Sequence, residues 1–167
     1  METKLYFAYG SNMNLKQMAY RCPKAQVLGR AVLTDYSLIF RGNSKGNGVA
    51  SIQPEKGARV EGVLWEVTPL CQASLDLYEG YPHLYGKEEI FVHIDGKRKA
   101  GVEVYVMTEP YQSQPAMPSW YYLQEILNGC RDNGISEESI WKAVERTKQE
   151  LVTNKKQRKH PDRGPEK

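Results

Sequence analysis

The sequence predicts an α+β fold, in which a mostly antiparallel mixed sheet curls toward a barrel and a few helices flank it. Short runs of alternating apolar residues recur along the 167-residue chain, as half-buried strands require. Segments with helical spacing of apolar residues are interspersed among them. The length suits one domain with a single core. We expect that domain to span residues 1–153, followed by a basic, disordered tail over residues 154–167.

The first predicted element is a buried strand over residues 4–9, where the apolar run is continuous. The Gly-Ser-Asn sequence at residues 10–12 interrupts this run as a tight turn. Apolar residues then return at helical spacing, at Leu15, Met18, Ala19 and Cys22. The chain therefore begins as a strand, a turn and a helix.

Four short strands follow, and a glycine-rich loop separates the second from the third. The predicted strands are residues 26–33, 36–41, 49–53 and 60–67. The loop over residues 42–48 is a poor match for a phosphate-binding P-loop, because that motif opens a helix and here another strand follows. We interpret it as a connection between strands, which leaves Asn43 within reach of a ligand.

A short helix is predicted over residues 68–79, with a signal at each end. Thr68 can cap its N-terminus, Pro69 suits its first turn, and Gly80 suits the position just past its C-terminus. These signals define the helix more sharply than its apolar pattern does.

The second half of the chain is predicted to contain a hairpin and two helices. Val and Ile alternate over residues 90–94 and 102–106, on either side of an Asp-Gly turn that favours hairpins. A proline-bearing loop over residues 109–118 leads to a helix over residues 119–130. The final helix, over residues 136–152, carries acidic residues in its first turn, as the helix macrodipole favours.

Composition excludes several classes of protein. No run approaches the roughly 20 apolar residues of a membrane span, and the first residues do not show the basic and apolar regions that are typical of a signal peptide. We therefore expect a cytoplasmic protein with no membrane partner. The cysteines and histidines, three of each, are scattered, which argues against a disulfide framework or a metal site. The tail alone carries a larger net positive charge than the +3 of the whole chain. Because the tail lacks aromatic residues, we expect it to be a solubilising segment and expect no nucleic-acid partner.

The turn after the first strand is the first candidate site. A strand that turns sharply into a helix leaves backbone N–H groups free at the helix N-terminus, where they can hold an anion or a polarised carbonyl oxygen. An equally weighted alternative is a structural turn in which Asn12 is the N-cap. A dinucleotide-binding interpretation fails, because only one glycine of the GxGxxG pattern is present.

Glu79 is the second candidate. It occupies the last turn of its predicted helix, where unpaired carbonyl groups disfavour a carboxylate. Its neighbours Tyr78, Tyr81 and Pro82 are bulky enough to exclude water, which would raise the pKa of its carboxyl group toward the range that a proton shuttle needs. The residues alone favour the alternative of a solvated helix-end side chain. Asp76, one turn earlier, is better explained as a surface residue than as a partner of Glu79.

Tyrosine is unusually frequent, with eleven residues against three phenylalanines. Each tyrosine buries a ring and offers a hydroxyl group, which suits a semi-polar pocket. Six fall on or beside predicted elements: Tyr6, Tyr9, Tyr85, Tyr105, Tyr121 and Tyr122. We expect most of them in the core or at a rim, and one or two in contact with a ligand.

Several of these segments resemble the gamma-glutamylcyclotransferase family. YFAYGSNM at residues 6–13 is similar to the family's substrate loop, and LDLYEGYP at residues 75–82 to the segment with the acid/base glutamate. Residues 118–134 are similar to the stretch with a substrate-contacting tyrosine, and FRGNSKG at residues 40–46 to another segment near the pocket. The resemblance covers about residues 4–150 and leaves the basic tail outside.

The resemblance implies that the protein cyclises gamma-glutamyl compounds to 5-oxoproline, with release of an amine or amino acid and without a metal or other cofactor. It implies that Glu79 is the general acid/base. The implied substrate-binding residues are Tyr6, Phe7, Ala8, Tyr9, Gly10, Ser11, Asn12 and Tyr122. The implied partner is a small-molecule gamma-glutamyl substrate. The oligomeric state stays open, with a homodimer among the alternatives.

Two alternatives remain beside this interpretation. The first is a related cyclotransferase for gamma-glutamyl amines or for a gamma-glutamyl-protected biosynthetic intermediate, since the sequence does not define the pocket walls that select the leaving group. The second is a non-catalytic binding or interaction protein on the same fold. The presence of Glu79 argues against the second alternative, because such a protein has no need of a base.

Overall fold

Five strands close into a barrel in the computed structural model, which describes residues 2–159. In chain order, the strands are β1 (Lys4–Ala8), β2 (Gln26–Gly42), β3 (Gly48–Val67), β4 (Tyr85–Ile94) and β5 (Lys97–Met107). Around the barrel the order is β1–β3–β2–β4–β5, and β1 closes it by pairing in parallel with β5. The other pairings between these strands are antiparallel. The predicted fold class, a mostly antiparallel sheet curled into a barrel, is therefore confirmed.

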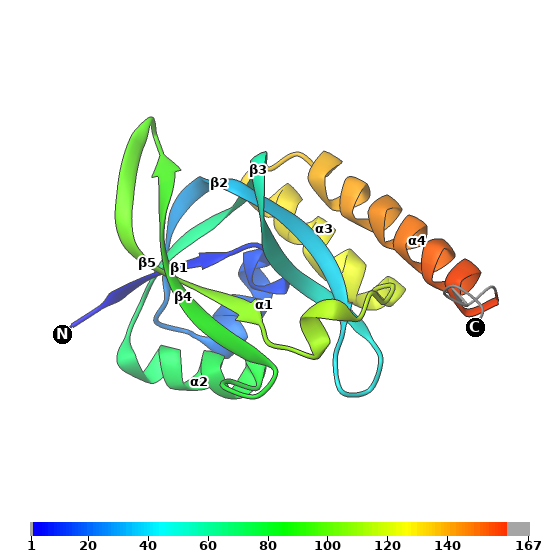
Figure 1. Cartoon of the computed structure of the whole chain (residues 1–167). Helices are drawn as coiled ribbons and strands as arrows, with labels where there is room; N and C mark the ends of the chain where they lie inside the picture. The colour runs from blue at the N-terminus through cyan, green and yellow to red at the C-terminus, as the bar shows by residue number, and fades with distance from the viewer. Residues whose placement is uncertain (1, 160–167) are drawn as a thin grey trace.

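Helices flank this barrel in the described part of the chain (Figure 1). They are the 3-10 helices η1 (Ser11–Met13) and η2 (Tyr111–Ser113) and the α-helices α1 (Leu15–Arg21), α2 (Pro69–Glu79), α3 (Trp120–Asn133) and α4 (Glu138–Lys159). In Figure 1, α2 lies below the barrel, and α3 and α4 lie to its right. Helices α1 and α2 contact each other at one end of the barrel, α3 packs on η1, and α4 packs on β2. Three of the four α-helices therefore lie near the segment that follows β1.

Apolar side chains from all five strands form one buried cluster. Phe7, Phe40, Ile52, Val92 and Val104 are fully buried in it, one from each strand. Burying a side chain of this size contributes about 1.5–3 kcal/mol. The cluster therefore gives the loops at the barrel ends a rigid support.

Strands β2 and β3 are longer than predicted, because each continues through a point where the sequence predicts a break. In β2 this point is Asp35, where φ is +63° and the register with β3 shifts between Thr34 and Tyr36. The Asp35 carboxylate accepts a hydrogen bond from the Gly57 N–H at 2.9 Å. A bulge of this kind bends a strand without ending it, so these polar residues mark a bend in a long hairpin.

The ends of α2 agree with the predicted signals. The Thr68 hydroxyl accepts a hydrogen bond from the Cys71 N–H at 3.2 Å, and Gly80 follows the helix with φ of +68°. The predicted hairpin turn is also confirmed, since Asp95 and Gly96 both have positive φ, as a two-residue hairpin turn requires.

Helix α4 differs from the prediction, because it continues to Lys159, seven residues past the expected end. The side chains of residues 155–157 are exposed. No pattern of buried apolar residues therefore marks this extension of the helix in the sequence. The division between a domain over 1–153 and a tail stays a prediction. Residues 160–167 of that tail lie outside the described residues.

The cysteine prediction needs a correction, because Cys22 and Cys71 form a disulfide. Cys22 follows α1 directly and Cys71 lies in the first turn of α2, so the bond joins the two helices. Their Cα atoms are 5.1 Å apart, within the range that disulfides require. The sequence separation of 49 residues conceals this proximity. Cys130 is free and buried.

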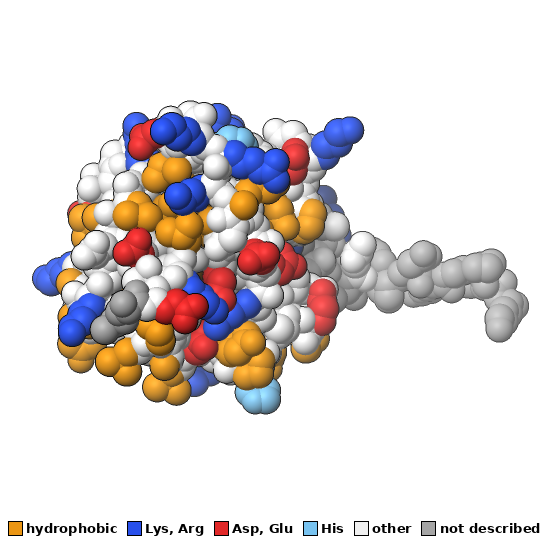
Figure 2. Space-filling view, turned by 90° about the vertical axis from the view of Figure 1, so that its left-hand side faces the viewer, with side chains coloured by type: hydrophobic (Ala, Val, Ile, Leu, Met, Phe, Trp, Pro, Cys, Tyr) orange, Lys and Arg blue, Asp and Glu red, His pale blue; other side chains and the backbone are white. Residues whose placement is uncertain are grey.

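The exposed faces carry charges of both signs. Within residues 2–159, no helix combines the length and the apolar character needed to cross a bilayer. On the face shown in Figure 2, acidic and basic side chains are interspersed with apolar ones.

Candidate active site

A cavity of about 220 Å³ opens where β1 ends and η1 begins. Residues 9–12 form one wall, Glu79 at the end of α2 forms another, and Ala50 of β3 closes a third side. Six lining residues are tyrosines: Tyr6, Tyr9, Tyr78, Tyr85, Tyr105 and Tyr122. The cavity therefore brings together the two segments that the sequence singled out, and its walls have the predicted semi-polar character.

Glu79 is half-buried in the last turn of α2 and lines this cavity. Removal from water raises the pKa of its carboxyl group from 4.5 to about 7, and the positive charge of Arg21 opposes the rise. The direction agrees with the expectation from the sequence. A pKa near 7 allows one group to accept and release protons near neutral pH.

Asn12 connects the two segments. Its Nδ2 donates to Glu79 Oε1 at 3.3 Å and to the Tyr6 hydroxyl at 2.9 Å. Its backbone carbonyl accepts from the indole N–H of Trp65 at 3.1 Å. The alternative in which Asn12 caps α1 is wrong, because Asn14 caps that helix with its own side chain. Asn12 is consequently free to face the cavity.

The turn into η1 also leaves backbone donors available. The carbonyl groups of Gly10 and Ser11 accept hydrogen bonds from Met13 and Asn14, which close η1. In the part of the chain that the structure describes, the N–H groups of Ser11 and Asn12 donate to no other backbone group. The first N–H groups of a helix have no partner inside it, so they are suited to a polar group of a ligand.

Hydrogen bonds to the barrel fix the tyrosine hydroxyls. The Tyr122 hydroxyl accepts from the Ala50 N–H at 2.9 Å, and the Tyr85 hydroxyl donates to the Ala50 carbonyl at 2.5 Å. The Tyr9 hydroxyl donates to the Tyr105 carbonyl at 2.6 Å. Burial raises the pKa of the Tyr9, Tyr85 and Tyr122 hydroxyls above the usual value, so they stay protonated at neutral pH.

Asp76 has its own partners and does not form a pair with Glu79. Its carboxylate accepts from the Tyr105 hydroxyl at 2.6 Å and lies 2.8 Å from the Lys87 ammonium group. Among residues 2–159, Glu79 is therefore the single carboxylate that lines the cavity.

Some predicted site residues lie elsewhere. Phe7 and Ala8 are 0% and 1% exposed and belong to the buried cluster, so their side chains do not line the cavity. Tyr121 is 83% exposed and is also outside it. Sequence reasoning missed Arg21, whose guanidinium group stacks on the Tyr78 ring at 3.6 Å from its centroid. A cation in the last turn of α1 was the available signal, but it also fits the helix macrodipole alone.

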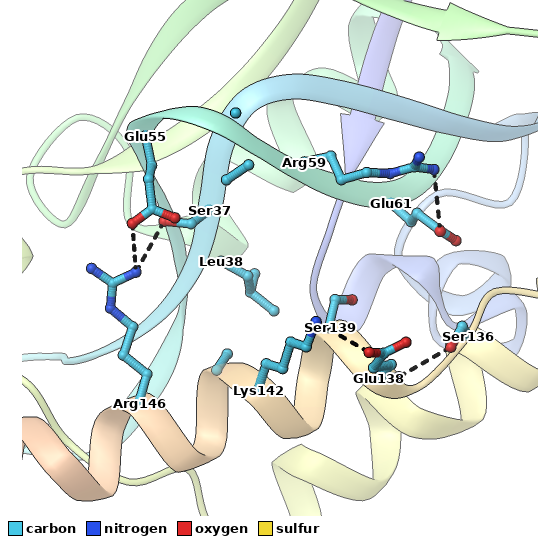
Figure 3. Close-up of a pocket in the computed structure, with 13 residues that line it drawn as sticks. Ser37, Leu38, Glu55, Arg59, Glu61, Ser136, Glu138, Ser139, Lys142 and Arg146 are labelled. Atoms are coloured by element: carbon cyan, nitrogen blue, oxygen red, sulfur yellow. Dashed lines mark hydrogen bonds and ion pairs between the residues drawn. The ribbon is translucent and has the colours of Figure 1, made fainter.

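A larger cavity of about 600 Å³ lies between the β2–β3 hairpin and α4 (Figure 3). Its charged side chains form ion pairs: Arg146 with Glu55 at 3.2 Å, Arg59 with Glu61 at 3.5 Å, and Lys142 with Glu138 at 3.1 Å. In the part of the chain that the structure describes, each charged side chain that lines this cavity has an oppositely charged partner. The smaller cavity is therefore the better candidate for an active site.

The chain is also similar to known proteins over most of its length. Residues 6–124 match the family model for gamma-glutamyl cyclotransferase, AIG2-like proteins. The chain is 36% identical over 150 residues to gamma-glutamylcyclotransferase of Mus musculus, covering 82% of this chain and 75% of that protein. It is 35% identical over 142 residues to the Homo sapiens protein, covering 80% and 73%. A solved structure of a gamma-glutamyl cyclotransferase has a TM-score of 0.72 at 33% identity, covering 88% of this chain and 87% of that one. The chain therefore belongs to the gamma-glutamylcyclotransferase family.

Proposed function

We propose that the protein cyclises gamma-glutamyl compounds, releasing 5-oxoproline and a free amine or amino acid without a cofactor. The observation that carries this proposal is a single carboxyl group, that of Glu79, with a pKa near 7 beside the turn of residues 9–12. Membership of the family supports the same class of reaction.

The reaction needs an acid and a base at one place. The neutral α-amino nitrogen of the substrate attacks its own γ-carbonyl carbon, so a C–N bond forms within the new ring. Glu79 takes the proton that the attacking nitrogen loses. The bond to the leaving nitrogen then breaks, and Glu79 delivers the proton to that nitrogen. One carboxyl group with a pKa near 7 can perform both transfers.

The nucleophile and the electrophile belong to one molecule, so the protein's main task is to hold a folded substrate. Effective molarities of well-oriented intramolecular reactions reach about 10⁵ M or more. The fixed hydroxyls of Tyr9, Tyr85 and Tyr122 form rigid walls for such a pose. This arrangement explains why one acid/base residue suffices.

The turn of residues 9–12 is suited to the α-carboxylate of the substrate. The N–H groups of Ser11 and Asn12 start a helical turn, and donors in that position favour a negative charge. The same donors would stabilise the oxyanion that develops at the γ-carbon. Matched substrates with a free or an amidated α-carboxylate separate these roles. We expect amidation to lower kcat/KM by about 5–150-fold, which corresponds to about 1–3 kcal/mol for an unsatisfied polar group. Equal values for the pair would leave oxyanion stabilisation as the loop's role.

The direct test is incubation of the protein with a panel of gamma-glutamyl compounds, followed by detection of 5-oxoproline. The panel contains gamma-glutamyl amino acids, gamma-glutamyl amines and glutathione, so that it also ranks leaving groups. The Glu79→Gln variant is the control, because it keeps the shape of the pocket and removes the base. Saturable binding of panel members without any 5-oxoproline would instead support the non-catalytic alternative.

A further inference from the structure

Arg21 lies at a junction between the substrate loop and the helix that carries Glu79. It is the last residue of α1 and is half-buried. Its Nη1 donates to Asn12 Oδ1 at 2.5 Å and to Ser11 Oγ at 3.4 Å. Its guanidinium plane stacks on the Tyr78 ring, whose hydroxyl lies 3.4 Å from the same Ser11 oxygen. These contacts fix the guanidinium group from two sides.

The contact with Arg21 decides which way the Asn12 amide points. A guanidinium group has donors and no acceptor, so only the amide oxygen of Asn12 can face it. The amide nitrogen must then face the opposite side, where it donates to Tyr6 at 2.9 Å and to Glu79 at 3.3 Å. Rotating the amide by 180° would set its N–H groups against the Arg21 donors and leave the Glu79 carboxylate without this hydrogen bond.

We infer that Arg21 is a positioning residue, which orients the Asn12 amide so that its nitrogen holds the Glu79 carboxylate in place for proton transfer. This inference rests on the proposed function, because that function makes Glu79 the base. Arg21 does not line the cavity and is not expected to touch the substrate.

The positive charge of Arg21 also favours the ionised form of the Glu79 carboxylate. Burial raises the pKa of Glu79, and Arg21 is the cation that opposes the rise. The other groups that face Glu79 are tyrosines with pKa raised by burial: Tyr6 and Tyr9 from β1 and the residue after it, Tyr85 from β4, Tyr105 from β5 and Tyr122 from α3. Tyr78 is on the same helix, and Lys87 is paired with Asp76 behind Tyr105. Loss of Arg21 therefore leaves the Glu79 carboxylate among neutral groups.

The first experiment measures the ionisation of Glu79 by ¹³C NMR of the labelled carboxyl group, with Glu79→Gln used to assign its signal. We expect Arg21→Met to shift the titration to higher pH and Arg21→Lys to leave it near that of the parent. Arg98→Met is the matched control, since Arg98 also stacks on an aromatic ring, 3.9 Å from the centroid of Phe91, but lies outside the cavity. This measurement needs no substrate, so it separates failure of the inference from failure of the proposed function.

The second experiment is kinetic, on a substrate that the parent converts to 5-oxoproline. We expect Arg21→Met to lower kcat by about 10²-fold with a smaller change in KM, as for a misplaced reacting group. Lys keeps the charge but not the planar fork of donors, so Arg21→Lys should give an intermediate kcat. In the Asn12→Ala background, Arg21→Met should have little further effect, because the two residues act as one unit.

Three outcomes would overturn the inference. The first is a parent-like kcat and Glu79 titration in a folded Arg21→Met variant. The second is a lower kcat with an unchanged titration, which would assign Arg21 a role in the fold alone. The third is full additivity with Asn12→Ala. If Arg21→Met does not fold, Arg21→Gln takes its place, because it keeps a donor toward Asn12 but removes the charge; a parent-like Glu79 titration in that variant would also overturn the inference.

Discussion

The side-chain amide of Asn12 donates to the Glu79 carboxylate at 3.3 Å, although 67 residues separate them in the chain. One partner belongs to the turn after the first strand, and the other ends a helix that follows the third strand. This contact makes a single site of two motifs that the sequence shows separately.

Replacing Glu79 by Gln should lower kcat by about 10²–10⁴-fold, because that is the usual contribution of general acid/base catalysis. The fold should be retained, since Gln keeps the shape of the side chain. Turnover is followed as 5-oxoproline formation. Glu138→Gln is the surface control, because Glu138 forms an exposed ion pair with Lys142 and does not line the cavity that contains Glu79. Parent-like turnover by Glu79→Gln would show that another group is the base.

Glu79 should also make folding stability depend on pH. Its pKa is about 7 in the folded protein against 4.5 for the free group, so between these values the folded state holds a proton that the unfolded state has released. The stability that this proton contributes to the folded state is fully present below about pH 4.5 and is lost as the pH rises through 7. We expect Glu79→Gln to lose this dependence, a difference of roughly 2–3 kcal/mol in the free energy of unfolding. Denaturant titrations of both proteins at several pH values measure it, and identical pH profiles would contradict the raised pKa.

Substitution of Gly10 should affect the pocket through added bulk. Its φ is −122°, which other residues can adopt, but a Cβ there would lie 3.2 Å from the Ala50 Cβ and 3.5 Å from the Tyr122 hydroxyl. We expect Gly10→Val to lower kcat/KM by about 10²-fold or more, with a smaller loss for Gly10→Ala. Gly86→Val is the control, because the nearest contact of a Cβ there is an ordinary 3.7 Å. Equal kinetics for Gly10→Val and the control would refute close approach at this loop.

The disulfide can be tested by counting thiols. In protein that is denatured without a reductant, we expect one reactive thiol per chain, that of Cys130, and three after reduction. In the folded protein even Cys130 should react slowly, because burial raises the pKa of its thiol to about 11. Reduction should lower the free energy of unfolding by about 2–5 kcal/mol. Three thiols before reduction would show that Cys22 and Cys71 are unpaired in solution.

Removal of residues 154–167 should leave activity unchanged and the thermal midpoint within about 2 °C, since the side chains of residues 155–157 are exposed. A truncation after Arg146 is the positive control. It removes the buried Thr147 and also Glu150, which pairs with Arg41 at 2.9 Å, so it should destabilise the protein. A large loss from the shorter deletion would mean that the tail contacts the domain or a partner.

Local signals in the sequence predicted much of the fold. The capping residues of α2 and the Asp-Gly turn were readable because they act on neighbouring backbone groups. The continuation of β2 through Asp35 could not be predicted, since the same polar residues occur in bulges and in loops. The Cys22–Cys71 pairing was missed because only the packing of α1 on α2 brings these residues together.

The sequence motifs of the candidate site could be recognised, but the residues that hold those motifs in place could not. Glu79 and the turn of residues 9–12 have a recognisable local pattern. The role of Asn12 depends on which asparagine caps α1, and Asn14, two residues later, was an equally good candidate by type. The role of Arg21 depends on its contact with Tyr78, which lies on a different helix. The resemblance to the family therefore singled out Glu79 as the candidate acid/base, whereas residue type and spacing alone identify neither that role nor the residues that hold the side chain.

The parallel pairing of β1 with β5 has a consequence for biosynthesis. Leu5 and Tyr6 emerge from the ribosome early, yet one edge of their strand is completed only by Val102 and Glu103. At about 5–20 residues per second, the first strand waits roughly 5–20 s for its neighbour. Tyr122 then has to follow before the pocket is closed. The turn of residues 9–12 is thus among the first segments to be made, but the cavity that it lines cannot be complete before most of the domain has been translated.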